Sequence, residues 1–307
     1  MWNLLGSRPV EILAWEVFGN DWKKDILEQL KISDSNTHVA DFGKIPDLSK
    51  LNFNNDVIFT WNGTTSGVRV PNASWIPTER EGLVLCDATS AVFAQNVEWE
   101  KLDVITFSWQ KVLGGEAAHG ILVLSPKAIE HLEKFTPSWP IPKIFRLTKS
   151  KKVIEGIFKG ETLNTPSMLC VEDYLDALKW VREIGGLEAC IKRANDSFNF
   201  INAWVANSSS IDFLCQEESN RSNTSVCLKF RDDRVINQDE DTQRNLAKEI
   251  GVLLEDEDVA LDVVNHRSAP PGLRIWTGAT VEPTDVRDLL PWIDWAYNQA
   301  FNKIIER

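Results

Sequence analysis

The stretch LVLCDATSAVFAQNVEWEKLDVITFSWQKVLGG, residues 83–115, is the part of the sequence that decides the fold. It contains two near-continuous apolar runs, LVLCDA (83–88) and VITFSW (104–109). A strand covered by helices on both faces is apolar almost throughout, whereas a strand with one wet face alternates. The two runs therefore predict neighbouring buried strands of a mostly parallel sheet.

Similar runs lie on either side of this stretch. VEILAWE (10–16), DVIFTW (56–61) and GILVLS (120–125) are also strand-like, and NDWKKDILEQLKI (20–32) has the pattern of an amphipathic helix. Strands that alternate with helices indicate an α/β fold whose sheet is mostly parallel and flanked by helices. We predict that fold class for the first part of the chain.

The rest of the sequence predicts a smaller α/β unit. After an irregular, basic stretch over 137–166, the expected elements are helices at 167–184, 186–206 and 241–255, strands at 225–230, 259–264 and 273–278, and a final helix from 284 onward. Pro291 is expected to kink or split that last helix. With about 150 residues per domain, we predict a large domain over 1–195 and a small C-terminal domain over 196–307.

Composition excludes several classes of protein. The 45 acidic and 33 basic residues give a net charge of −12, and a nucleic-acid partner would require a basic face. No run approaches the roughly 20 apolar residues of a membrane span, and the start lacks the pattern of a signal peptide. The five cysteines are widely spaced and form no CxxC pair, so we expect no metal site, no disulfide framework and a cytoplasmic location.

Lys111 is the first candidate for chemistry. It follows a buried strand and precedes Gly114 and Gly115 in SWQKVLGGE (108–116). Burial lowers the pKa of a lysine, and glycine lets the backbone approach a ligand closely, which suits a Schiff-base lysine. The alternative is a solvent-exposed lysine beside a Gly-Gly turn.

Asp87 is the second candidate, because it ends the run LVLCDA. Ligands of open α/β sheets bind outside the carboxyl ends of the strands. A carboxylate there can pair with the protonated pyridine nitrogen of a cofactor. The alternative is a helix N-cap, which the following Ala-Thr-Ser also suits. Lys111 and Asp87 would then face the same crevice from neighbouring strand ends.

Two arginines and a histidine gather near the last predicted strand. His266, Arg267 and Arg274 lie within nine residues, and arginine forks match carboxylate and phosphate geometry. They predict a clamp for a doubly anionic substrate. The alternative is a solvated loop before a strand whose arginine pairs with a carboxylate.

Several segments together resemble the phosphoserine aminotransferases, which are class V, fold-type I enzymes. The resemblance covers essentially the whole chain in order and lies in DATSAVF (87–93), TFSWQKVLGGEAAHG (106–120), KIFRLTK (143–149), GIFKGETLNTPSMLCVEDYLDAL (156–178) and APPGLRIW (269–276). It implies pyridoxal 5'-phosphate as the cofactor, held in the large domain. The implied reaction transfers the amino group of glutamate to 3-phosphohydroxypyruvate, giving O-phosphoserine and 2-oxoglutarate for serine biosynthesis, with pyridoxine biosynthesis as a second pathway.

The resemblance also implies roles for residues around the cofactor. Lys111 would hold the cofactor covalently and move the proton in the reaction, and Asp87 would keep the pyridine nitrogen protonated. Thr64 would bind the 3'-oxygen, and Gln110 would bind the phosphate. Trp22 would stack on the ring, with Phe18 as the alternative.

Further roles concern the substrate and a second subunit. Asn164 and Thr165 resemble a pair that reaches the cofactor phosphate from the partner subunit, which implies a homodimer with shared active sites. His266 and Arg267 would contact the phosphate of the substrate, and Arg274 would bind its α-carboxylate. No nucleic acid or membrane is expected as a partner.

The start of the chain departs from the family pattern. Family members carry a segment ahead of the position of Met1 that includes a phosphate-cradling turn at a helix N-terminus and two residues of the substrate site. We therefore expect an N-terminally incomplete member. The alternatives are a cofactor-poor remnant of the family and a related class V aminotransferase acting on another keto acid.

A basic stretch between Lys143 and Lys159 is unusual in so acidic a chain. It has six basic residues and one acid, Glu155. One interpretation is a solvated loop. The other is a local positive field that steers a phosphorylated substrate toward the cleft.

Overall fold

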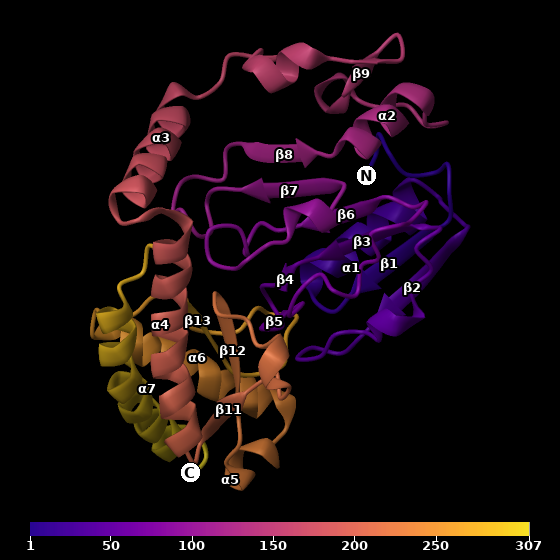
Figure 1. Cartoon of the computed structure of the whole chain (residues 1–307). Coiled ribbons are helices and arrows are strands. Elements are labelled where there is room, and N and C mark those ends of the chain that lie inside the picture. Colours follow the sequence, from indigo (N-terminus) through magenta and orange to yellow (C-terminus); the bar gives the residue numbers. More distant parts are fainter. Residues whose placement is uncertain (307) are drawn as a thin grey trace.

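A six-stranded sheet forms the centre of the N-terminal part of the computed structural model, which describes residues 1–306 (Figure 1). Its strands, in spatial order, are β2 (Ser35–Val39), β1 (Val10–Ala14), β3 (Asp56–Thr60), β6 (Val84–Asp87), β7 (Val104–Ser108) and β8 (Gly120–Leu124). The first five are parallel, and β8 is antiparallel to β7 at one edge. The α/β fold with a mostly parallel sheet, predicted from the sequence, is confirmed.

The apolar runs form strands because both faces of the sheet are covered. Successive side chains of a strand point to opposite faces, so Ile12 and Ile58 enter one core while Leu13 and Phe59 enter the other. Every residue of β1 and β3 is buried. Near-continuous hydrophobicity is therefore what these positions require.

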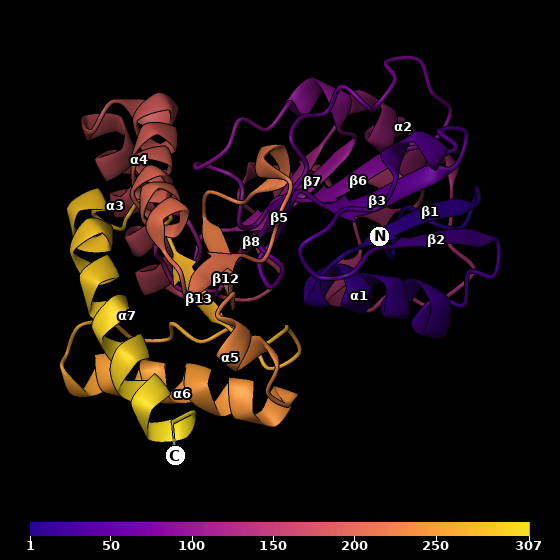
Figure 2. The same ribbon diagram turned by 90° about the horizontal axis from the view of Figure 1, so that it is seen from below.

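Helices cover one face of this sheet. Helix α1 (Val17–Lys24) continues into a π-helical turn, Asp25–Gln29, and Figure 2 shows α1 beside the strands. Helix α2 (Pro126–Lys134) packs against the same core through Ala128 and Leu132. This arrangement places α1 directly after the carboxyl end of β1.

A long connection joins the sheet to the C-terminal part of the chain. It contains only short elements: the hairpin β9 (Thr148–Lys149) and β10 (Lys152–Val153) and two 3₁₀ turns. Figure 1 shows it running from α2 to α3 (Met168–Glu183). Lys152 pairs with Glu133 at 3.3 Å, and steering by this basic stretch stays a prediction.

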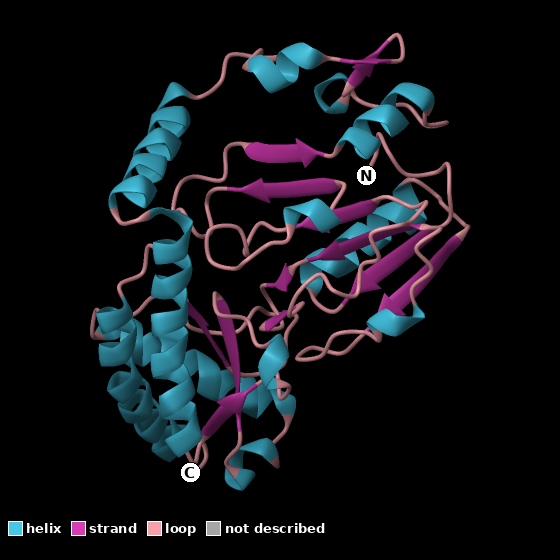
Figure 3. Ribbon diagram, in the orientation of Figure 1, coloured by secondary structure: helices cyan, strands magenta, loops and turns pink. Residues whose placement is uncertain are grey.

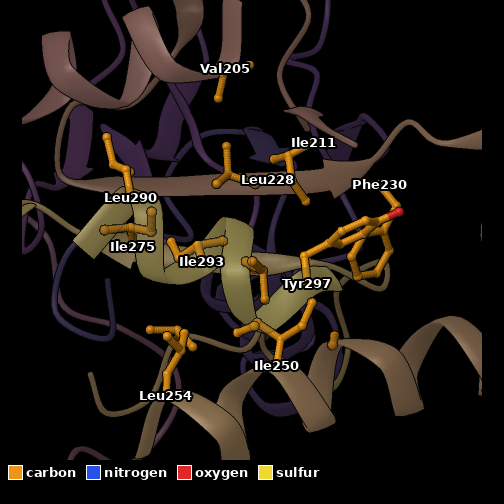
Figure 4. Close-up of a cluster of buried hydrophobic side chains, with 14 of the residues drawn as sticks. Val205, Ile211, Leu228, Phe230, Ile250, Leu254, Ile275, Leu290, Ile293 and Tyr297 are labelled. Carbon is orange, nitrogen blue, oxygen red and sulfur yellow. The ribbon is translucent and has the colours of Figure 1, made fainter. Parts of the chain in front are cut away.

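The C-terminal part is built on a three-stranded antiparallel sheet. Its strands are β11 (Ile211–Phe213), β12 (Ser225–Phe230) and β13 (Leu273–Trp276). Around it lie α4 (Gly186–Asn207), α5 (Asp233–Ile236), α6 (Glu240–Asp256) and α7 (Pro283–Ile304), which Figure 3 distinguishes from the strands by colour. Figure 4 shows the core, in which Leu228 and Ile275 of the sheet meet Ile250, Ile293 and Tyr297 of the helices.

The domain boundary predicted at 195/196 falls inside α4. That helix is continuous and packs against both α3 and α7. The buried residues of α4 belong to two different hydrophobic cores. Ala194 lies in a core with Trp109, whereas Ile201 lies in the core of the C-terminal sheet. The boundary remains a prediction.

One sequence-based prediction is wrong, and a second is wrong in one of its two alternatives. Residues 259–264 form no strand, because Asp258 and Asp262 adopt φ values of 56° and 53° that break the extended chain. Pro291 does not split the last helix, since α7 runs without a break over Pro283–Ile304, and a kink at Pro291 stays a prediction. A proline costs a helix one hydrogen bond, and burial of Leu290 and Ile293 on either side offsets that loss. Within residues 1–306, no helix is both long and apolar enough to cross a membrane.

Candidate active site

Three titratable side chains converge at one edge of the six-stranded sheet. Glu16 lies two residues after β1, Asp87 ends β6 and Lys111 lies three residues after β7. These strands are parallel, so their carboxyl ends share an edge, which is where open α/β sheets bind ligands. The charges of all three act on one another.

One of the two carboxylate oxygens of Asp87 is engaged in hydrogen bonds. Its Oδ1 accepts hydrogen bonds from the Thr89 backbone N at 2.9 Å and from Thr89 Oγ1 at 2.6 Å. Among the described residues none donates to Oδ2. Burial raises the pKa of Asp87, while the bonds from Thr89 and the charge of Lys111 oppose that rise. No helix begins here, so the N-cap alternative is excluded; Asp87 stabilises a turn instead.

Lys111 is half-buried, and its Nζ makes no hydrogen bond to any described residue. Burial lowers the pKa of its ammonium group, and the positive charge of Arg274 lowers it further; the carboxylates of Asp262, Glu16 and Asp87 act in the opposite direction. A lowered pKa increases the fraction of free amine, which is the nucleophilic and basic form. Lys111 is therefore not a fully exposed surface lysine.

Lys111 opens into a cleft of about 450 Å³ between the sheet edge and the C-terminal part of the chain. Gln110, Arg274 and Trp276 line it with Lys111, and the remaining lining is largely apolar. The Lys111 Nζ lies 5.8 Å from the centroid of the Trp276 ring, within reach of a cation–π contact. A volume of this size is typical of small-molecule sites.

Thr64 and Gln110 lie beside these groups. Thr64 is buried after the short strand β4 (Asn62–Gly63), which pairs with β5 (Val68–Arg69). Its Oγ1 donates to Ser90 Oγ at 2.9 Å, in the turn that follows Asp87. The Oε1 of Gln110 is buried without a partner among the described residues, so this amide has acceptor capacity left for a ligand.

Trp22 is placed away from the cleft. It packs against the core that contains Ile26 and Leu30, beneath the sheet. Phe18, one turn earlier in α1, is 43% exposed, and it follows the carboxyl end of β1 directly. Phe18 is thus the more exposed of the two side chains, and the choice between them as the aromatic partner of the cofactor stays a prediction.

Four further predicted site residues, Asn164, Thr165, His266 and Arg267, do not line this cleft within one chain. Asn164 and Thr165 are exposed in the segment before α3. His266 Nδ1 accepts a hydrogen bond from the Ser268 backbone N at 3.2 Å. Arg267 lines a separate pocket of about 200 Å³, together with other cationic side chains, Arg244 and Lys248.

Sequence reasoning missed three residues of the site: Glu16, Asp262 and Trp276. Glu16 had a usable signal, since it follows an apolar strand just as Asp87 does. Its carboxylate is fully buried and accepts from the Gly19 backbone N at 2.6 Å and from Thr65 Oγ1 at 3.1 Å. Asp262 and Trp276 enter the cleft through tertiary packing, which no local pattern shows.

Comparison with known proteins agrees with this geometry. Residues 45–266 match the model of the family described as aminotransferase class V. A phosphoserine aminotransferase of Methanosarcina barkeri is 54% identical over 97% of this chain and 78% of its own length. Among solved structures, a phosphoserine aminotransferase of Cytophaga hutchinsonii shares the fold with a TM-score of 0.78, 19% identity and coverage of 96% of this chain and 78% of that one. A phosphoserine aminotransferase of Trichomonas vaginalis solved with bound pyridoxal phosphate shares it with a TM-score of 0.72, 17% identity and coverage of 95% and 77%. The chain belongs to the phosphoserine aminotransferase family of the class V aminotransferases.

Proposed function

We propose that this chain transfers the amino group of glutamate to 3-phosphohydroxypyruvate, giving O-phosphoserine and 2-oxoglutarate, with pyridoxal 5'-phosphate as cofactor. The observation that supports this most directly is the cleft that joins Lys111, a lysine with a lowered pKa, to Arg274, in a chain 54% identical to a phosphoserine aminotransferase. Asp87 lies close enough for its charge to act on Lys111.

The side chains present fit the cofactor. The free Oδ2 of Asp87 can accept from a protonated pyridine nitrogen, and the unpaired Nζ of Lys111 is available for covalent attachment. Gln110 lies beside Lys111 in the cleft, where its side-chain amide N–H group could donate to the cofactor phosphate. When bound, pyridoxal phosphate supplies an electron sink that stabilises negative charge at the α-carbon of the amino acid.

Asp87 and Lys111 would act on protons. A buried carboxylate beside a cation favours the charged form of that cation, so Asp87 keeps the ring nitrogen protonated. Lys111, whose pKa burial lowers, can remove a proton as the free amine and return it as the ammonium. The largely apolar lining of the cleft limits the access of water to that transfer.

Arg274 would bind the α-carboxylate that both substrates share. Its side chain lines the same cleft as Lys111, and a guanidinium fork orients a carboxylate through two parallel hydrogen bonds. His266 and Arg267 would contact the phosphate, which distinguishes phosphoserine from serine. Because neither reaches the cleft of its own chain, this role requires that a second subunit or a movement bring the groups together.

We propose a homodimer in which Asn164 and Thr165 reach the cofactor of the partner subunit. The segment around them exposes an unusual number of large apolar side chains: Ile144, Phe145, Ile157, Phe158, Leu163, Met168, Leu169 and Leu175. Exposed apolar surface of this extent is typical of protein interfaces, and two-fold dimers are the commonest soluble assemblies.

The test is a direct assay of the reaction in reverse. Purified protein supplied with pyridoxal phosphate, O-phosphoserine and 2-oxoglutarate should form glutamate, and serine in place of phosphoserine should give far less. Arg267→Ala should raise KM for phosphoserine more than KM for glutamate. Equal rates with serine and phosphoserine would instead favour a class V aminotransferase for an unphosphorylated keto acid, and no turnover would favour a remnant of the family.

A further inference from the structure

Arg274 is already paired with a carboxylate of its own chain. Its Nη2 lies 2.7 Å from Oδ2 of Asp262, and both residues line the cleft that contains Lys111. Among the described residues, no other partner accepts from the guanidinium group of Arg274. One carboxylate oxygen of Asp262 therefore binds one side of the Arg274 guanidinium group, which could bind both oxygens of a carboxylate.

The position of Asp262 allows its side chain to move away from Arg274. It lies in a turn between α6 and β13 and has a φ of 53°, and its side chain is 81% exposed, whereas that of Arg274 is only 19% exposed. The turn itself is held by the backbone, since the Arg274 N donates to the Val263 O at 2.7 Å. Rotation of the Asp262 side chain thus needs no rearrangement of the strand.

We infer that Asp262 occupies Arg274 as an internal stand-in for the substrate α-carboxylate and is displaced when an amino or keto acid binds. The inference rests on the proposed carboxylate-binding role of Arg274. Asp262 is then a specificity-determining residue, because only a ligand that carries a carboxylate can take the place of the Asp262 carboxylate on Arg274. A ligand without a carboxylate would leave Arg274 paired with Asp262.

Charge balance around Lys111 supports an exchange of one carboxylate for another. The charge of Arg274 lowers the pKa of Lys111, whereas that of Asp262 raises it. Without Asp262, the guanidinium group of Arg274 would have no ion-pair partner among the described residues. With Asp262 in place, the guanidinium group of Arg274 is paired with a carboxylate both before and after a substrate carboxylate arrives.

If the ion pair between Asp262 and Arg274 were purely structural, its removal would have the opposite effect on ligand affinity. If Asp262 only fastens the turn to β13, its removal should loosen the turn that carries part of the cleft lining, and ligand affinity should fall. If Asp262 competes with substrate, its removal should raise affinity. An exposed ion pair is typically weak, so the competing role predicts a gain of about threefold to fivefold.

The experiment compares glutarate binding to the cofactor-loaded parent and to Asp262→Asn by isothermal titration calorimetry. Glutarate carries two carboxylates but no amino group, so it binds without reacting. Asp258→Asn is the matched control: Asp258 is exposed in the same connection between α6 and β13, has a φ of 56° and makes no ion pair with any described residue. Asparagine tolerates a positive φ as aspartate does, and both variants lose one negative charge. Asp262→Gly, which also fits the turn, provides a second removal of the carboxylate.

We expect Kd for glutarate to fall about threefold to fivefold in both Asp262 variants and to stay within about twofold of the parent in Asp258→Asn. Unchanged or weaker binding in the Asp262 variants would overturn the inference. So would an equal gain in Asp258→Asn, because that result would reflect net charge alone. Absence of glutarate binding to parent and variants would also overturn it, since Arg274 would then receive no carboxylate. A parent that binds glutarate but does not transaminate phosphoserine would refute the proposed function alone.

Discussion

Replacing Glu16 with glutamine should change how the stability of the protein depends on pH. Burial raises the pKa of Glu16 from 4.5 to about 7, against the opposing hydrogen bonds from Gly19, Phe18 and Thr65, and the charge of Asp87 adds to the rise. The folded protein therefore keeps a proton on Glu16 that the unfolded chain loses above pH 4.5. That contribution to stability is full below pH 4.5 and is lost as pH rises through about 7.

The size of the effect follows from the shift. A rise of about 2.5 pKa units, at about 1.4 kcal/mol per unit, gives roughly 3 kcal/mol in total, of which about 2 to 3 kcal/mol falls between pH 5 and pH 8. Glutamine does not titrate, and its carbonyl oxygen can still accept from the Gly19 N. Relative to Glu16→Gln, the parent should therefore lose about 2 to 3 kcal/mol of unfolding free energy over that range.

The assay is urea unfolding followed by tryptophan fluorescence at several pH values from 5 to 8, with the difference between parent and Glu16→Gln taken at each. Titrating groups that do not interact with Glu16 contribute equally to both proteins, so the difference reports Glu16 together with the two charges coupled to it, Asp87 and Lys111. Glu100→Gln, at an exposed position, controls for the loss of one negative charge. A difference that stays constant across the pH range would refute the account of Glu16 as a buried, protonated acid.

Three further predictions concern the cofactor and the dimer. Asp87→Asn should lower kcat about 100-fold, because an adjacent carboxylate shifts the pKa of its partner by about 1–3 units; a near-normal rate would show that Asp87 only stabilises its turn. Phe18→Ala should weaken pyridoxal phosphate binding about threefold to tenfold in a fluorescence titration, as expected for one aromatic stack. Trp22→Ala should leave that binding largely intact and cost about 2 kcal/mol of stability in urea unfolding. A loss of cofactor binding in Trp22→Ala and not in Phe18→Ala would assign the stacking role to Trp22. Leu169→Asp, at a side chain that is 73% exposed, should shift the protein from dimer to monomer in light scattering while its helix content is unchanged, and a stable dimeric variant would place the interface elsewhere.

The central strands could be predicted from sequence because burial on both faces leaves a continuous apolar run. β2 gave no such signal, since it is a polar edge strand whose residues Asn36 and His38 bind Glu11 of β1. The antiparallel direction of β8 was equally hidden, because its apolar run resembles those of the parallel strands. Helix α2 did have a readable start, Ser125 as N-cap followed by proline.

Site residues that lie just after the end of a predicted strand could be found from the sequence. Site residues that tertiary packing brings to the cleft could not. Asp87 and Lys111 could be placed in one crevice because each follows a run that forms a parallel strand. The run VALDVV predicted a strand, yet Asp258 and Asp262 turn the chain and leave Leu261 74% exposed. That turn carries Asp262 to Arg274, and no periodic pattern of residues encodes such a contact. The burial of Trp22 was hidden for a similar reason, since sequence shows an aromatic side chain but not the face of α1 to which it belongs.

Mapping the lysine that holds the cofactor tests the central claim most directly. The protein would be incubated with pyridoxal phosphate, reduced with borohydride, digested and examined by mass spectrometry, which requires no turnover. We predict one pyridoxyl group per chain, on the peptide that contains Lys111, and its loss in Lys111→Arg. A label mainly on another lysine, or labelling of Lys111→Arg to the same extent as the parent, would contradict the assignment of this cleft as the active site.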